Sequence, residues 1–166
     1  MAKTVGGTPA TVALDKAGVT YHVREYSVTV APGKGGDTTY GEAVAVSLGV
    51  QPDRVFKTLV ASVDDSLTVA VVPVTATLDL KSLAQAVGGK RADMAEVALA
   101  ERATGYVIGG ISPLGQRKQL PTVIDETVDL FDTIFVSAGK RGLQLEVNPD
   151  DLVRLTAAVV APVARQ

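Results

Sequence analysis

The chain has 166 residues, of which 46% are hydrophobic and 20% are charged, a composition typical of one soluble domain that would span residues 1–166. Its net charge of −2 excludes a general basic field for nucleic acid, so a nucleic-acid partner has to bind a local patch. The chain has no cysteine, which excludes disulfides and a thiolate metal site.

The start of the chain lacks the apolar run of a signal peptide. No apolar run approaches the roughly 18 residues that a membrane span needs. We therefore expect a cytoplasmic protein with no membrane partner.

Caps, glycines and hydrophobic periodicity divide the chain into short helices and strands. Thr8 as N-cap before Pro9 opens the first helix, and the sequence of residues 39–42 fits a capping box for the second. In chain order we expect a helix at 9–17, a strand at 21–26, a loop at 28–38, a helix at 39–48, strands at 55–63 and 67–74, a helix from Asp79 to Gly88, an edge strand at 92–94, a helix at 95–104, strands at 106–108, 122–125, 134–137 and 143–147, and a last helix after Asn148.

Several of the expected strands are joined by short turns, and helices lie between the others. The strands at 55–63 and 67–74 should form a hairpin, and the tail after Pro162 should fray. We predict an α+β fold with a mixed, curved, largely antiparallel sheet.

The segment 105–121 carries the first sign of a binding site. Gly109 and Gly110 leave the backbone bare for a ligand, and Arg117 and Lys118 follow closely. This combination suits a pocket for an anionic or phosphate-bearing ligand. The alternative is a hairpin connection that is merely rich in glycine.

Common catalytic arrangements find little support. His22 is the one histidine, so no two-histidine metal site exists, and Ser112 lies outside the G-x-S-x-G pattern of a serine nucleophile. The carboxylates of residues 125–132 suggest a solvated turn. The glycine-rich residues 32–36 lack the order of a phosphate-binding P-loop, because Lys34 is followed by glycine.

Lys57 is the positive candidate. Alternation over 55–63 places it on an otherwise apolar face, where lost hydration would lower the pKa of its amine. The alternative is that its stem packs on that face while the ammonium reaches solvent.

Three blocks, VFKTLV (55–60), GGISPLGQRKQLP (109–121) and SAGKRGLQLE (137–146), resemble the YbaK/EbsC family of aminoacyl-tRNA deacylases in order and spacing. The chain is most similar to the free-standing Cys-tRNA(Pro) deacylases of that family. The resemblance implies a barrel-like mixed sheet with flanking helices. It also implies cleavage of the ester of a mischarged aminoacyl-tRNA, with no metal or organic cofactor.

The resemblance assigns roles to residues near the reacting ester. Lys57 matches the family lysine that positions the substrate, and Gly109 and Gly110 match the loop whose backbone would hold the ester carbonyl. Ser137 and Tyr26 match family residues that contact substrate or line the pocket mouth. Their alternatives are a serine that satisfies its own turn and a half-buried strand tyrosine.

The remaining candidates lie further out or depart from the family. Arg117, Lys118, Lys140 and Arg141 would contact phosphates of the tRNA acceptor end, or else belong to solvated loops. Gln144 stands where we expect relatives to carry an acidic or small polar residue, so it bears on amino-acid choice.

In Cys-specific relatives the substrate thiol is thought to attack its own carbonyl, so the protein supplies orientation rather than a nucleophile. A prolyl-tRNA synthetase is an expected partner, because the chain shows no obvious anticodon-reading module. Two alternatives stay open: the same chemistry on Ala-tRNA(Pro), and a non-catalytic module that binds tRNA ends or nucleotides.

Overall fold

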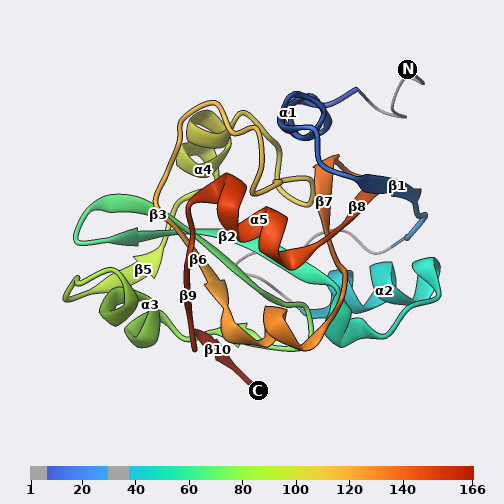
Figure 1. Cartoon of the computed structure of the whole chain (residues 1–166). Coiled ribbons are helices and arrows are strands. Elements are labelled where there is room, and N and C mark those ends of the chain that lie inside the picture. Colours follow the sequence, from blue (N-terminus) through green and yellow to red (C-terminus); the bar gives the residue numbers. More distant parts are fainter. Residues whose placement is uncertain (1–6, 30–37) are drawn as a thin grey trace.

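The computed structural model describes residues 7–29 and 38–166, so most of the expected loop at 28–38, including its glycine-rich residues 32–36, lies outside the described residues (Figure 1). The described helices are α1 (Pro9–Ala17), α2 (Thr38–Leu48), α3 (Leu80–Ala86), α4 (Val97–Thr104) and α5 (Pro149–Thr156), with short 3-10 helices η2 (Pro52–Arg54) and η3 (Glu126–Leu130). The strands are β1 (Tyr21–Glu25), β2 (Phe56–Val63), β3 (Ser66–Pro73), β4 (Thr77–Leu78), β5 (Ala92–Met94), β6 (Thr122–Asp125), β7 (Ile134–Lys140), β8 (Leu143–Val147), β9 (Val159–Ala161) and β10 (Ala164–Arg165).

The larger sheet has the strand order β5-β2-β3-β6-β9. β2 and β3 form the predicted antiparallel hairpin, and β5 pairs with the other side of β2 as the expected edge strand. β6 and β9 join in parallel, which makes the sheet mixed. The predicted α+β fold with antiparallel-rich sheets is confirmed.

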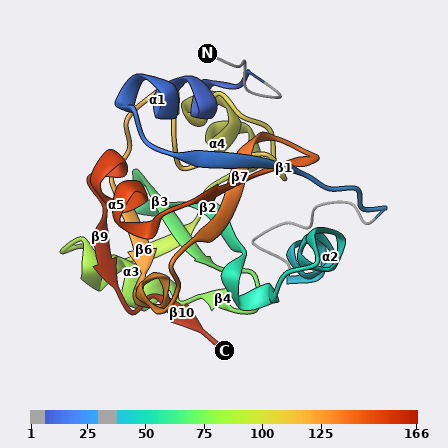
Figure 2. The same ribbon diagram turned by 45° about the vertical axis from the view of Figure 1, so that its right-hand side comes forward.

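A second sheet, β1-β8-β7, is antiparallel throughout. It meets the larger sheet at a parallel bridge between Val55 and Phe135, just before β2 and within β7. Figure 2 shows β1, β7 and α1 on one side of the molecule and α3 with the C-terminus on the other. The bridge therefore brings the start of β2 next to β7, which matters for the site described below.

Apolar side chains cover both faces of β2, as its alternation requires. Phe56 and Val60 pack in one core cluster with β3, β6, β7 and β8, whereas Ala61 and Val63 pack in another beneath α3. Few aromatic side chains contribute, so valine, leucine and alanine fill most of the core, as the composition predicts. Because both faces are covered, β2 is a fixed base on which side chains can be held in place.

Caps account for several helix boundaries. Thr8, Asp79 and Asn148 each accept a backbone N–H of the first turn of their helix. This confirms the predicted caps at Thr8 and Asn148 and the predicted start of a helix at Asp79. The second helix begins at Thr38, one residue before the predicted cap.

The stretch 106–108 is not a strand, which corrects the prediction. The Tyr106 side chain is buried and its hydroxyl donates to the Leu114 carbonyl, while Val107 is 54% exposed. The segment 105–121, which the structure describes in full, folds back on itself through such contacts and not through a sheet ladder. Apolar composition alone could not distinguish these two arrangements.

Two further expectations need correction: the frayed tail, and the solvated turn at Asp125, although Glu126, Asp129 and Asp132 of that turn are exposed as expected. Val163 is fully buried and β10 pairs with β4, so the tail after Pro162 is held in place and does not fray. Asp125 lies in no solvated turn: it is 2% exposed, and one of its oxygens accepts the N–H groups of Val163 and Ala164. A buried carboxylate with these donors anchors the end of the described chain.

None of the helices in the described ranges combines the length and the apolar character needed to cross a bilayer.

Candidate functional site

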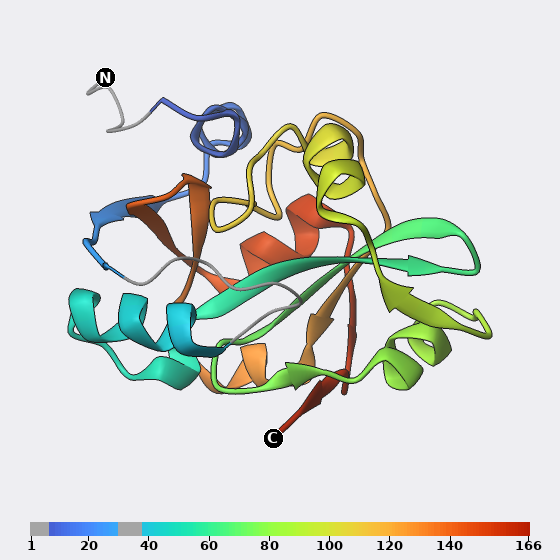
Figure 3. The ribbon, with the colours of Figure 1, turned by 180° about the vertical axis from the view of Figure 1, so that it is seen from behind.

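A cavity of about 130 Å³ lies where β2, α2, α4, the segment after α4 and the β7–β8 pair meet. Its walls are mostly apolar. The lining residues are Tyr40, Gly41, Val44, Val55, Phe56, Lys57, Thr58, Leu59, Val60, Val74, Met94, Ala95, Val97, Ala100, Glu101, Ile108, Gly109, Ile111, Ser137 and Gln144. Figure 3 shows the segment that follows α4 lying between that helix and α1.

The structure brings four of the residues singled out from the sequence to this cavity. They are Lys57, Gly109, Ser137 and Gln144. Lys57 is half-buried in β2, so neither full burial nor a freely solvated side chain describes it. Three segments that lie far apart in the sequence thus converge, while the role of each residue stays a prediction.

Residues 107–110 form a tight turn beside the cavity. The Gly110 N–H donates to the Val107 carbonyl at 2.9 Å, and Gly109 has a φ of +85°, which glycine adopts without strain. Gly110 itself is buried, does not line the cavity and already uses its N–H within the turn. Of the two predicted glycines, Gly109 is therefore the one whose backbone borders the cavity.

Tyr26 reaches the site only through a second tyrosine. Tyr26 is 8% exposed and does not line the cavity, and its hydroxyl lies 2.8 Å from that of Tyr40, which does. Burial and this hydrogen bond raise the pKa of Tyr40 well above its usual range. Tyr40 is therefore a neutral hydroxyl at the cavity wall over the physiological pH range.

Two buried oxygens at the cavity have no hydrogen-bond partner among the described residues. They are Oγ1 of Thr58 and Oε1 of Gln144. Such groups are costly to leave unpaired, so their presence in a cavity suggests that a ligand or water meets them there. By contrast, Ser137 Oγ accepts the Gly139 N–H at 3.0 Å.

Sequence reasoning missed Tyr40, Thr58 and Glu101 as residues of the site. Glu101 of α4 lines the cavity, and its carboxylate accepts the Ile108 N–H at 2.8 Å. A polar residue next to Lys57 in an apolar strand was the signal available for Thr58. Glu101 gave none, because a glutamate on a short helix usually faces solvent.

The four predicted phosphate-contacting cations are all exposed, and none lines the cavity. Arg117 and Lys118 lie against the end of α4, where their N–H groups donate to the carbonyls of Thr104 and Ala103. Arg141 follows β7, and its Nε donates to the Ile108 carbonyl at 2.8 Å. Arg141 is thus tied to the glycine turn.

Other groups weighed from the sequence lie elsewhere. His22 is exposed on β1 at a separate shallow hollow with Glu146. Ser112 is fully buried, and its Oγ accepts the Leu114 N–H. In the described part of the chain, no three His, Cys, Asp or Glu side chains come together as potential metal ligands.

Known proteins are similar to this chain in both sequence and fold. The sequence pattern of the family described as "Aminoacyl-tRNA editing domain" matches residues 36–155. A protein of Enterococcus faecalis with the provisional name Cys-tRNA(Pro)/Cys-tRNA(Cys) deacylase EbsC is 45% identical over 121 residues, which are 72% of this chain and 74% of EbsC. The uncharacterized protein YwhH of Bacillus subtilis is 29% identical over 67% of this chain and 71% of its own length.

A crystal structure described provisionally as a trans-editing enzyme for prolyl tRNA synthetase superposes with a TM-score of 0.80 at 25% identity, covering 95% of this chain and 96% of the other. The hypothetical protein APE2540 superposes equally well, at 25% identity over 95% and 99% of the two chains. Taken with the family match over most of its length, these relatives show that the chain belongs to the aminoacyl-tRNA editing domains, in the YbaK/EbsC family of aminoacyl-tRNA deacylases.

Proposed function

We propose that this protein acts in trans on Cys-tRNA(Pro) and cleaves its aminoacyl ester, with the amino acid held in the cavity that Lys57 and Gly109 border. The observation that carries the proposal is the cavity itself: it is small, mostly apolar and bordered by a cation, a glycine backbone and two unpaired oxygens. A volume of about 130 Å³ suits a short side chain and leaves the tRNA outside. The name of the 45% identical EbsC points to the same substrate.

The proposed chemistry uses the substrate's own thiol. The sulfur attacks the ester carbonyl, a carbon–sulfur bond forms, the carbon–oxygen bond to the ribose breaks, and the thiol proton passes to the departing ribose oxygen. The product is a cyclic thioester and free tRNA. The protein then has to orient the ester and stabilise the negative charge that develops on its carbonyl oxygen.

Three of the cavity residues have a task in this reaction that their position allows. The Gly109 N–H would donate to the developing oxyanion, and Lys57 would hold the ester near it. The unpaired Gln144 oxygen would accept a hydrogen bond from the substrate ammonium or thiol. Arg117, Lys118 and Lys140 are exposed cations available to phosphates of the acceptor end, and a prolyl-tRNA synthetase is the proposed partner.

The test is deacylation of tRNA(Pro) charged separately with cysteine, alanine and proline. We expect loss of cysteine well above the buffer rate, and about a hundredfold slower loss with Lys57→Ala, the scale of removing one electrostatic group at a reacting centre. Lys81→Ala is the matched control, because Lys81 is exposed on α3 and does not line the cavity. We expect it to behave like the unmodified protein.

Cysteine methylated on sulfur separates the two routes to ester cleavage. The blocked thiol cannot cyclise, so tRNA charged with it should survive if the substrate thiol is the nucleophile. Its rapid loss would assign the attack to water. Loss of alanine but not cysteine would transfer the proposal to Ala-tRNA(Pro), and no loss of any amino acid would leave a binding module.

A further inference from the structure

The direction of the central peptide in the turn at 107–110 decides which of its polar groups faces the cavity. This peptide joins the Ile108 carbonyl to the Gly109 N–H. In a trans peptide these two groups point in opposite directions, and all peptide bonds of the described residues are trans. Whatever holds the Ile108 carbonyl therefore sets the direction of the Gly109 N–H.

Glycine makes the turn able to adopt two forms. The φ of +85° at Gly109 and the hydrogen bond from Gly110 to Val107 are those of a type II turn. Rotation of the central peptide would convert it to type I, which glycine also tolerates. The local sequence alone does not choose between the two, so the choice depends on contacts from outside the turn.

Two charged side chains supply such contacts to Ile108. Arg141, in the connection between β7 and β8, donates through Nε to the Ile108 carbonyl at 2.8 Å. Glu101 of α4 accepts the Ile108 N–H at 2.8 Å. The two peptides on either side of Ile108 are thus each held by a charge of appropriate sign, and such charge-assisted bonds are stronger than neutral ones.

Close packing keeps Arg141 at the turn. A Cβ added to Gly110 would lie 3.0 Å from the Arg141 nitrogen and 3.1 Å from the Lys140 carbonyl carbon, so the backbones of the turn and of this connection touch. Gly109 lines the cavity and Arg141 does not. Among residues 7–29 and 38–166, no hydrogen bond takes up the Gly109 N–H.

We propose that Arg141 is a positioning residue: it holds the Ile108 carbonyl on the outer side of the turn, so that the Gly109 N–H faces the cavity and the ester carbonyl bound there. The inference rests on the proposed function for its substrate. It differs from a phosphate contact, because the guanidinium acts through a peptide group and its effect falls on the chemical step. Arginine suits the task, since its planar fork stays charged at any physiological pH.

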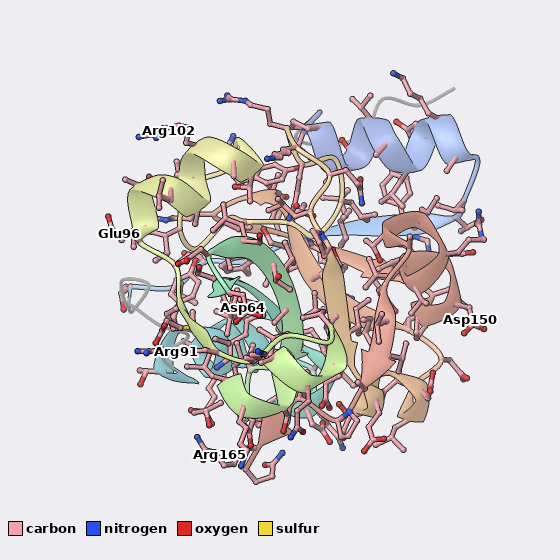
Figure 4. All side chains as sticks on the ribbon, turned by 90° about the vertical axis from the view of Figure 1, so that its left-hand side faces the viewer. Asp64, Arg91, Glu96, Arg102, Asp150 and Arg165 are labelled. Carbon is pink, nitrogen blue, oxygen red and sulfur yellow. The ribbon has the colours of Figure 1, made fainter. Side chains whose placement is uncertain are left out.

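The experiment compares Arg141→Ala and Arg141→Lys with a charge-matched control, Arg102→Ala. Arg102 is exposed, and Figure 4 shows its side chain pointing outward from α4. Deacylation of Cys-tRNA(Pro) gives kcat and KM separately. The NMR chemical shift and hydrogen-exchange rate of the Gly109 amide, measured without tRNA, report the turn directly.

For Arg141→Ala we expect kcat to fall at least about tenfold, part of the loss seen when an oxyanion donor is removed, with KM changed less than about twofold. The Gly109 amide resonance should shift and exchange faster. Arg141→Lys keeps the charge without the planar donor and should recover only part of kcat. Arg102→Ala should change neither kcat nor the amide.

A raised KM with unchanged kcat and an unmoved Gly109 amide would overturn the proposal and make Arg141 a phosphate contact. If the unmodified protein deacylates none of the charged tRNAs, the proposed function fails, and the amide alone decides the inference. In that case a shifted Gly109 amide in Arg141→Ala keeps the positioning role, and an unchanged one overturns it.

Discussion

Replacing Thr58 by valine should make the protein more stable and less active. Thr58 Oγ1 is buried at the cavity wall and bonds to no group among the described residues. An unpaired buried hydroxyl costs about 1–3 kcal/mol. Valine puts a methyl group in nearly the same place and suits a strand, so most of that cost should disappear.

The expected gain lies at the low end, because the rest of the side chain is half-buried beside a cavity that water can enter. We expect about 1 kcal/mol. Unfolding a chain of 166 residues carries an entropy of about 350 cal/mol/K, so the melting temperature should rise by about 3 °C. Differential scanning calorimetry resolves such a change.

Thr122→Val is the matched control. Thr122 is also a threonine in a strand, and it is 5% exposed. Its Oγ1, however, donates to the Leu120 carbonyl at 3.1 Å. This change should lower the free energy of unfolding by about 1 kcal/mol. If the melting temperature of Thr58→Val equals or lies below that of the unmodified protein, or if its free energy of unfolding falls as far as that of Thr122→Val, the reasoning is refuted. We also expect Thr58→Val to slow deacylation, since a substrate would lose the hydroxyl as a partner.

Three further results are expected. Gly115→Ala should lower the free energy of unfolding by about 3 kcal/mol, because the φ of Gly115 is +67° and the new Cβ would lie 2.4 Å from the Pro9 oxygen. Gly18→Ala, measured in the same chemical denaturation series, should lower it by only about 1 kcal/mol, because Gly18 has a similar φ of +70° but open space around the new Cβ. Tyr40→Phe should reduce the loss of stability between pH 9 and 11: the pKa of Tyr40 is raised in the folded protein, so only the unfolded chain ionises from pH 10, and stability falls as pH rises. Asp125→Ala should lower the free energy of unfolding by about 3 kcal/mol and speed hydrogen exchange of the amides at 163–164, because the Asp125 carboxylate accepts their N–H groups. Unchanged exchange of these amides would contradict the anchoring role.

Local signals were sufficient for much of the fold. The caps at Thr8, Asp79 and Asn148 and the alternation of β2 are decided by neighbouring residues, and the structure agrees with them. β9 and β10 were missed because each is short and is stabilised by pairing with distant β6 and β4. Pairing of this kind leaves no trace in a short window of sequence.

The site was predictable only in part, for the same reason. Lys57, Gly109, Ser137 and Gln144 came from the three blocks shared with the family, and all line the cavity. The sequence could not show that Tyr26 reaches the cavity through another tyrosine, because that depends on how α2 packs. Nor could it show that Arg141 bonds to a carbonyl 33 residues away.

The pairing of β1 with β8 has a consequence for synthesis on the ribosome. Tyr21 lies opposite Val147, so the second sheet cannot close until almost the whole described chain has emerged. Contacts so distant in sequence form slowly, after a large loop has been closed. Ser137 and Gln144 face each other in that sheet and line the cavity. A nascent or truncated chain that ends before β8 therefore has the lysine of β2 but lacks Gln144 and the strand that pairs with Ser137, so the ability to bind a charged tRNA end should appear only late in translation, once β8 has paired.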